Sequence, residues 1–70
     1  MPREAFAVTL KMLRLQHGLT QQELAEQLGI SAVTISGYEL GRREPSIEIL
    51  ERIADCFGVS VDYLLGRTNN

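Results

Sequence analysis

The sequence has 70 residues, 44% of them hydrophobic, and a formal net charge of −2 at pH 7. This length limits the chain to one domain with one core, and the apolar content is typical of a globular protein rather than of a disordered tail. Cys56 is the only cysteine and His17 the only histidine, so an intramolecular disulfide is excluded and a metal site is not expected. We therefore expect side-chain packing to stabilise the fold without metal or cofactor.

The apolar residues do not form a membrane segment. No apolar run approaches ~18 residues, and Arg3 and Glu4 lead into an ordinary amphipathic segment rather than a signal peptide. An unpaired cysteine without a secretion signal fits the reducing cytoplasm. The negative net charge argues mildly against a nucleic-acid partner, although binding depends on local rather than total charge.

The first two predicted helices are separated by a glycine. Gly18 is a suitable C-terminal cap for the first helix, whose inner residues at helical spacing are Phe6, Leu10, Leu13 and His17. Thr20 then opens a second helix with Glu23 three residues later. This spacing predicts a capping box, in which each side chain bonds the backbone amide of the other residue. The inner face of the second helix holds Leu24, Ala25 and Leu28.

Three serines predict the starts of the remaining helices. Each is a good N-cap, and each helix is followed by a glycine that can end it. The third helix runs from its cap to about residue 39 or 40, a loop occupies residues 41–45, and a polar tail over residues 67–70 is expected to fray. The caps are Ser31, Ser46 and Ser60, and the glycine stops are Gly41, Gly58 and Gly66. The pattern predicts an all-α domain of five helices.

The segment from about residue 20 to residue 40 has the pattern of a helix-turn-helix. Its two short helices are separated by about three residues around Gly29, which can adopt the left-handed conformation of a tight turn. The small side chain of Ala25 lets the two helices cross closely. The apolar residues that would meet between them are Leu24, Leu28, Ile30, Ile35 and Tyr38.

Six motifs in this order make the signal specific. They are TQQELA at 20–25, LGIS at 28–31, TIS at 34–36, YE at 38–39, GRREP at 41–45 and FGVSVDYLL at 57–65. Together they resemble the Xre/Cro-like family, which includes the lambdoid phage repressors, over about residues 8–67. The resemblance implies a compact domain of the lambda-repressor-like type over residues 1–70. It also implies that the helix over residues 32–39 enters the major groove of double-stranded DNA.

The resemblance further implies which residues meet DNA. On a helical wheel Ile35 and Tyr38 point to the core, and the opposite side would read base edges. Phosphate contacts are expected from the first residue of the second helix, from the amides at that helix end and from the loop after the third helix. Ser31 is a cap that can add a phosphate contact, and Thr34 has either a structural or a phosphate-binding role. The remaining expected residues are Ala32, Val33, Ser36 and Gly37 for base edges, and Gln21, Arg42 and Arg43 for phosphates.

Two features depart from the family pattern. Ala32, Val33 and Gly37 offer no side-chain hydrogen bonds, so readout would depend on Ser36, on methyl contacts to thymine and on DNA shape. Leu40 stands where the family commonly has asparagine. The first departure concerns sequence preference, the second removes one polar contact near the DNA backbone, and neither changes the predicted fold.

The family also suggests one internal contact and one intermolecular contact. An ion pair is expected between Arg14 and Glu39, joining the first helix to the end of the third. Dimerisation is expected through the last helix, although the same apolar residues would alternatively complete the core of the monomer. These candidates are Val61, Tyr63, Leu64 and Leu65.

The favoured function is a transcriptional regulator, a repressor that binds a two-fold operator as a homodimer. The alternative is a protein-interaction module, regulatory or antitoxin-like, that keeps this fold with weak or no DNA binding. The sequence has no nucleophile–base pair, metal constellation or glycine-rich phosphate loop, so we expect neither an enzyme nor a small-molecule substrate. The ending over residues 64–67 resembles the point at which longer relatives enter a linker, which is compatible with a larger regulator.

Overall fold

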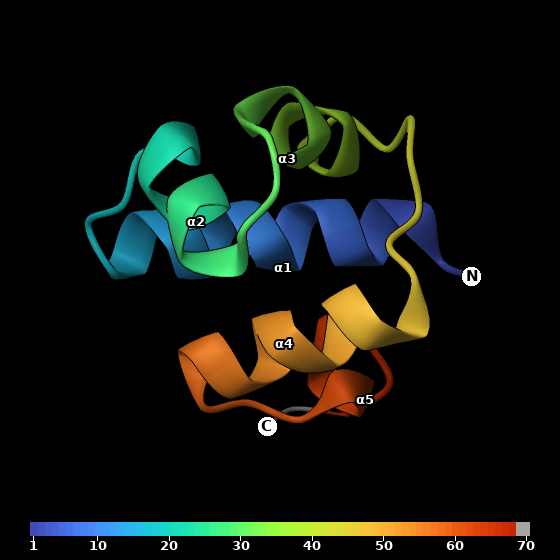
Figure 1. Ribbon diagram of the computed structural model, residues 1–70. Coiled ribbons are helices and arrows are strands. Elements are labelled where there is room, and N and C mark those ends of the chain that lie inside the picture. Colours follow the sequence, from blue (N-terminus) through green and yellow to red (C-terminus); the bar gives the residue numbers. More distant parts are fainter. Residues whose placement is uncertain (69–70) are drawn as a thin grey trace.

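The computed structural model describes residues 1–68. Within them the chain forms five helices and no strands (Figure 1), in agreement with the predicted all-α fold. None of these helices combines the length and apolar character that crossing a membrane requires. The tail expected to fray extends to residues 69–70, which lie outside the described part. The helices are α1 (Arg3–Gln16), α2 (Gln21–Leu28), α3 (Ala32–Glu39), α4 (Ile47–Phe57) and α5 (Val61–Leu64).

Helices α2 to α5 begin at the predicted caps. The Oγ1 atom of Thr20 accepts the N–H of Glu23 at 3.0 Å, and a carboxylate oxygen of Glu23 accepts the N–H of Thr20 at 2.9 Å, which completes the capping box. At the other three helices the serine oxygen accepts the amide three residues later, at 3.0–3.2 Å. These bonds satisfy amides that a helix start otherwise leaves without an acceptor.

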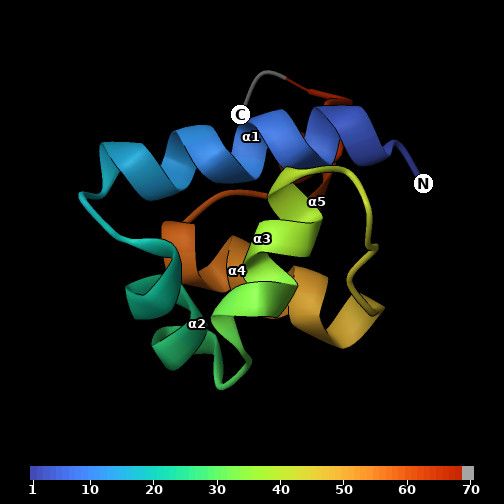
Figure 2. The same cartoon turned by 90° about the horizontal axis from the view of Figure 1, so that it is seen from above.

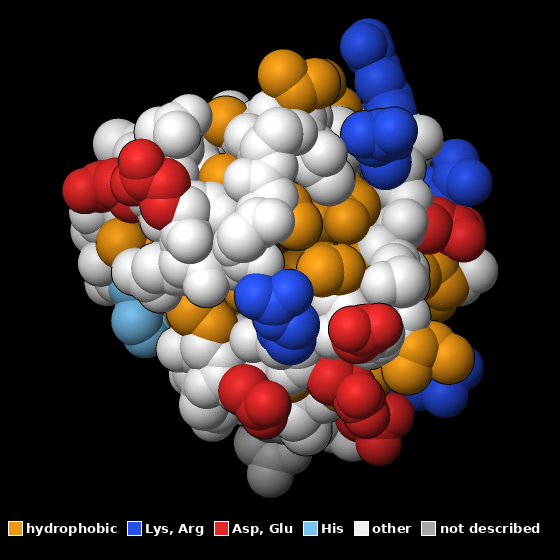
Figure 3. Space-filling model, in the orientation of Figure 1, with side chains coloured by type: hydrophobic (Ala, Val, Ile, Leu, Met, Phe, Trp, Pro, Cys, Tyr) orange, Lys and Arg blue, Asp and Glu red, His pale blue; other side chains and the backbone are white. Residues whose placement is uncertain are grey.

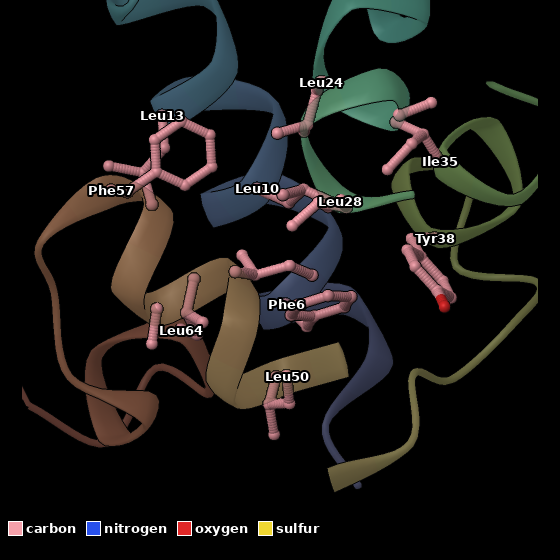
Figure 4. Close-up of a cluster of buried hydrophobic side chains, with 13 residues drawn as sticks. Phe6, Leu10, Leu13, Leu24, Leu28, Ile35, Tyr38, Leu50, Phe57 and Leu64 are labelled. Carbon is pink, nitrogen blue, oxygen red and sulfur yellow. The ribbon is translucent and has the colours of Figure 1, made fainter. Parts of the chain in front are cut away.

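The core lies against one face of α1. In Figure 1, α2 and α3 lie above α1 and α4 and α5 lie below it, and Figure 2, seen from above, shows α1 along one edge with α2, α3 and α4 on the same side of it. The rings of Phe6 and Tyr38 meet edge to face with centroids 5.7 Å apart, a favoured aromatic geometry. The largest fully buried side chains, several of which are seen in Figure 4, are Phe6, Leu10, Leu24, Leu28, Ile35, Ile53 and Leu64.

The last helix corrects part of the predicted dimer interface. Leu64 is fully buried in the core, so it is not available to a second chain. Helix α5 is a single turn that packs against α1 and α4, and its one inward position must be apolar to close that end of the core. Val61, Tyr63 and Leu65 are half-buried against the same cluster.

Candidate nucleic-acid interface

A left-handed glycine sets the angle between α2 and α3. Gly29 has φ 71°, and the next amide, of Ile30, returns to the carbonyl of Ala25 at 3.0 Å. Glycine adopts this conformation without the Cβ penalty of other residues. Ala25 is fully buried where the two helices meet, so α3 packs through Ile35 and Tyr38 and keeps its other side toward solvent.

The outer side of α3 carries a shallow groove. It is lined by Val33, Ser36, Gly37 and Leu40 from the helix and its end, and by Arg42 and Arg43 from the following loop. Val33 is 77% exposed and Leu40 61% exposed. The groove therefore contains the aliphatic side chains of Val33 and Leu40 and the hydroxyl group of Ser36. At Gly37 it contains only backbone, because glycine has no side chain.

Two positions on α3 differ from the expected set. Ala32 is half-buried against the core and does not line the groove, because the first residue of the helix lies at the edge between the inner and outer faces. Leu40 was not expected in the groove but lines it. It lies one turn after Ser36 and two turns after Val33, and this spacing could have identified it from the sequence.

The loop after α3 folds back onto the helix. The amides of Arg42 and Arg43 donate to the carbonyl of Gly37 at 2.9 and 3.2 Å. The side chain of Arg43 crosses the helix at Gly37, and its Nη1 lies 3.4 Å from the Oγ1 of Thr34. That hydroxyl also bonds the Oγ of Ser31 at 2.9 Å. The guanidinium is thus held beside the first turn of α3 rather than in the distal part of the loop.

The expected ion pair between Arg14 and Glu39 is present. Arg14 donates from Nε and Nη2 to the two carboxylate oxygens at 2.7 and 3.0 Å, and from Nη1 to the carbonyl of Leu19 at 2.8 Å. Both side chains are almost entirely removed from solvent. The hydrogen bond to Glu39 raises the pKa of Arg14 above its ordinary value. The pair joins α1 to the end of α3 and thereby fixes the helix that carries the groove.

The same carboxylate orients Gln21. The Nε2 atom of Gln21 donates to Glu39 at 3.2 Å. Because a carboxylate only accepts hydrogen bonds, the amide nitrogen of Gln21 must face it, and the second hydrogen of that nitrogen remains for another acceptor. Gln21 is also the first residue of α2, where the helix dipole favours an anion. A phosphate oxygen is the kind of acceptor that suits this position.

Part of the basic side chains lies near the groove. In Figure 3, several Lys and Arg side chains lie at the upper right, over the end of α3 and the loop that follows, and others lie near the middle of this face and at its lower right, whereas Asp and Glu lie at the left, at the bottom and at the right edge. The ion pairs found among residues 1–68 do not engage Arg42 or Arg43. The local charge beside α3 is therefore positive although the chain is acidic overall.

The described residues provide no obvious metal site. Residues 1–68 hold no group of three His, Cys, Asp or Glu side chains arranged to bind a metal ion. Cys56 is half-buried, its Sγ lies 3.2 Å from the Oε1 of Gln27, and burial raises the pKa of its thiol. It behaves as a small packing residue.

Comparisons with known proteins agree with this geometry. The profile of a family described as helix-turn-helix matches residues 10–64. The uncharacterised HTH-type transcriptional regulator YqaE of Bacillus subtilis is 45% identical over 93% of this chain and 56% of its own length. The CTXphi transcriptional repressor RstR of Vibrio cholerae is 32% identical over 86% and 54%. The crystal structure of the clp gene regulator ClgR from Corynebacterium glutamicum is similar with a TM-score of 0.84 and 36% identity, over 96% of this chain and 71% of that one. The chain thus spans about half the length of these two curated relatives.

Proposed function

The chain belongs to the Xre/Cro-like family of DNA-binding helix-turn-helix transcriptional regulators, and we propose that it represses transcription by binding a two-fold DNA operator as a homodimer. The curated relatives named above are transcriptional regulators. In this proposal α3 enters the major groove of double-stranded DNA, and the protein acts in the cytoplasm.

The observation that carries the proposal is the outer face of α3. It is exposed, it is flanked by arginines that no described ion pair engages, and it lies beside the start of α2, where Gln21 keeps one amide hydrogen for an acceptor. Phosphates on the two sides of a groove require donors in this arrangement. A protein-binding surface of the same size would require neither the arginines nor the oriented glutamine.

We expect these DNA contacts to be rich in phosphates and poor in bases. Gln21, Arg42 and Arg43 supply donors for the backbone, with Ser31 and Thr34 able to add hydroxyl contacts at the first turn of α3. The base edges would meet Val33, Ser36 and Leu40. Only Ser36 among these offers a side-chain hydrogen bond, so thymine methyl groups and DNA shape carry most of the preference.

A repressor requires only that the bound protein occupies the operator. The relative RstR bears that function in its name. With few cations beside α3, a second copy would double the phosphate contacts and align them with a two-fold site. The half-buried residues Val61, Tyr63 and Leu65 are the part of α5 that a dimer interface could still use.

A selection from random duplexes tests the proposal directly. We expect enrichment of an inverted repeat whose half-sites lie about 10 base pairs apart, bound with a steep dependence on salt. Arg42→Ala should weaken binding to all duplexes alike and reduce the salt slope by about one phosphate. Arg52→Ala, an exposed arginine on α4, is the matched control and should change neither.

The alternative function has one observation in its favour, namely the aliphatic character of the outer face of α3. Val33 and Leu40 would suit a protein partner as well as a base edge. If no duplex is bound above background at low salt, the domain is an interaction module instead.

A further inference from the structure

The side chain of Arg43 lies on α3, although the residue belongs to the loop after this helix. Its stem crosses α3 at Gly37 and takes the space that a side chain there would fill. Its Nη1 atom lies 3.4 Å from the Oγ1 of Thr34, in the first turn of α3. Gly37 and Arg43 both line the groove on the outer face of the helix. The loop therefore places a guanidinium on a part of α3 that has no side chain of its own.

The hydroxyl of Thr34 holds this guanidinium in place. Since an arginine only donates hydrogen bonds, the oxygen of Thr34 is the acceptor. The hydroxyl hydrogen of Thr34 is then available to the Oγ of Ser31, at 2.9 Å. The same Oγ accepts the amide of Thr34 at 3.2 Å as the cap of the helix. These bonds connect the guanidinium to the first turn of α3.

One edge of the guanidinium remains without a partner. The bond to Thr34 uses Nη1, and within residues 1–68 the structure gives neither Nε nor Nη2 of Arg43 an acceptor. The N–H groups of these two atoms are parallel and can donate to two neighbouring acceptors at once. Arg14 uses the same two atoms to bind both carboxylate oxygens of Glu39. Arg43 thus presents a free pair of donors whose position is already fixed.

We propose that Arg43 determines sequence specificity by recognising a guanine in the major groove through these two N–H groups. This role rests on the proposed function, because it requires α3 to enter the major groove of an operator. It replaces the phosphate contact expected of Arg43 by a contact to a base edge. It also gives one strong base contact to a helix face that otherwise has few donors.

The chemistry of the guanidinium selects guanine among the four bases. The major-groove edge of guanine carries two neighbouring acceptors, O6 and N7. Adenine carries an acceptor beside a donor, cytosine carries a donor, and thymine carries one acceptor beside a methyl group. Because a guanidinium has no acceptor of its own, only guanine satisfies both of the free N–H groups of Arg43.

The position of the guanidinium on α3 favours a base over a phosphate. In a helix-turn-helix the N-terminal residues of the recognition helix meet the base edges, and the guanidinium lies beside that turn. The neighbouring side chain of Val33 is aliphatic, so it does not compete for the acceptors of the base. Arg42, which is exposed in the loop, keeps the role of a phosphate contact.

Selections from random duplexes with the unmodified chain and with Arg43→Ala test this role. The unmodified chain should enrich one guanine per half-site that Arg43→Ala no longer enriches, while the other positions of the site are kept. On the selected duplex, Arg43→Ala should lower the affinity by about tenfold or more, and the salt slope should stay close to that of the unmodified chain. Arg42→Ala is the matched control, which should weaken binding to all duplexes alike and keep the guanine.

Replacing this guanine by 7-deazaguanine tests the contact at a single atom. The loss of N7 should cost the unmodified chain roughly fivefold in affinity and should have no further effect on Arg43→Ala. Inosine, which lacks only the minor-groove amino group of guanine, is the control base and should be bound as guanine is. Thr34→Val removes the hydroxyl acceptor and keeps a side chain of similar size, so it should reduce the preference for guanine by a smaller factor. Thermal unfolding should confirm that the variants are folded.

Three results would overturn the role of Arg43. The first is that Arg43→Ala enriches the same site as the unmodified chain. The second is that it weakens all duplexes alike and lowers the salt slope by about one phosphate, which would show a phosphate contact. The third is an equal loss on 7-deazaguanine in both proteins. In all three cases the proposed function stands, because the unmodified chain still binds its duplex. If the unmodified chain binds no duplex above background, the proposed function and this role fail together.

Discussion

The side chain of Arg43 lies directly on Gly37. A Cβ placed on this glycine would be 2.7 Å from the Cδ of Arg43 and 2.8 Å from its Cγ, closer than such atoms normally approach. The stem of the arginine thus takes the space that a side chain on α3 would occupy. The absence of a side chain at position 37, which weakens the helix, is what allows a loop cation to reach the first turn of α3.

Gly37→Ala should stabilise the fold and weaken DNA binding at the same time. Alanine in the middle of a helix gains up to about 1 kcal/mol over glycine, but its methyl group displaces Arg43 from the face of α3. The test is a double-mutant cycle with Arg43→Ala, which measures unfolding and duplex affinity. In the Arg43→Ala background the glycine substitution should no longer affect affinity. Equal losses in both backgrounds would mean that the methyl group itself clashes with DNA.

Glu39→Ala should be among the most destabilising single changes in the chain. It leaves the guanidinium of Arg14 almost buried and without its charge partner, which costs about 3–5 kcal/mol in comparable pairs. Urea denaturation at neutral pH measures this loss. Replacing both residues together, as Arg14→Met with Glu39→Leu, should restore much of the free energy of unfolding. If the double variant is as unstable as the single one, the ion pair is not the cause.

Val33 should contribute to sequence preference through a methyl contact. Removing the 5-methyl group of a thymine in the selected site, by substituting uracil, should cost about 1 kcal/mol, or roughly fivefold in affinity. Replacing the same thymine by uracil should have little effect on the affinity of the Val33→Ala variant for the duplex. Affinities measured by fluorescence anisotropy for the four combinations of protein and duplex decide this point. An unchanged uracil effect would place the thymine against another residue.

Glu44 should make the N-terminus sensitive to acid. The hydrogen bond from Arg3, at 2.8 Å, is the main cause that lowers the pKa of this carboxyl, and the nearby N-terminal amine, at 3.5 Å, lowers it further. A carboxyl with a lowered pKa stabilises the folded state above its ordinary pKa, and this contribution is lost as the pH falls through the lower value. Glu44→Gln should therefore reduce the loss of thermal stability below about pH 4.5. Melting curves between neutral and acid pH measure it.

The helix boundaries were predictable because their signals are local. A hydroxyl at the cap and a glycine after the last turn act within a few residues, so the starts of α2 to α5 followed directly from the sequence. The pairing of Arg14 with Glu39 came from the family resemblance. No local pattern joins two residues 25 positions apart.

What the sequence did not predict depends on tertiary packing, and the base contact expected of Ala32 stays a prediction. Ala32 lies at the edge of a helical face, and only the angle of α3 against α1 determines on which side it falls. Leu64 is one of several apolar residues on a single helical turn. A helical-wheel projection of such a short helix does not show which of these side chains points into the core. The path of Arg43 depends on the backbone of the loop, which folds back onto the carbonyl of Gly37.

The caps at Thr20, Ser31, Ser46 and Ser60 also bear on how quickly the chain folds. Each fixes the first residue of its helix through a bond that spans only three residues, so this bond requires no contact with distant segments. Chains dominated by such short-range contacts cross a low entropic barrier and fold in microseconds to milliseconds. We therefore expect this chain to regain its native state quickly after a thermal excursion, so that the DNA binding proposed for it would follow the amount of protein rather than the time since synthesis.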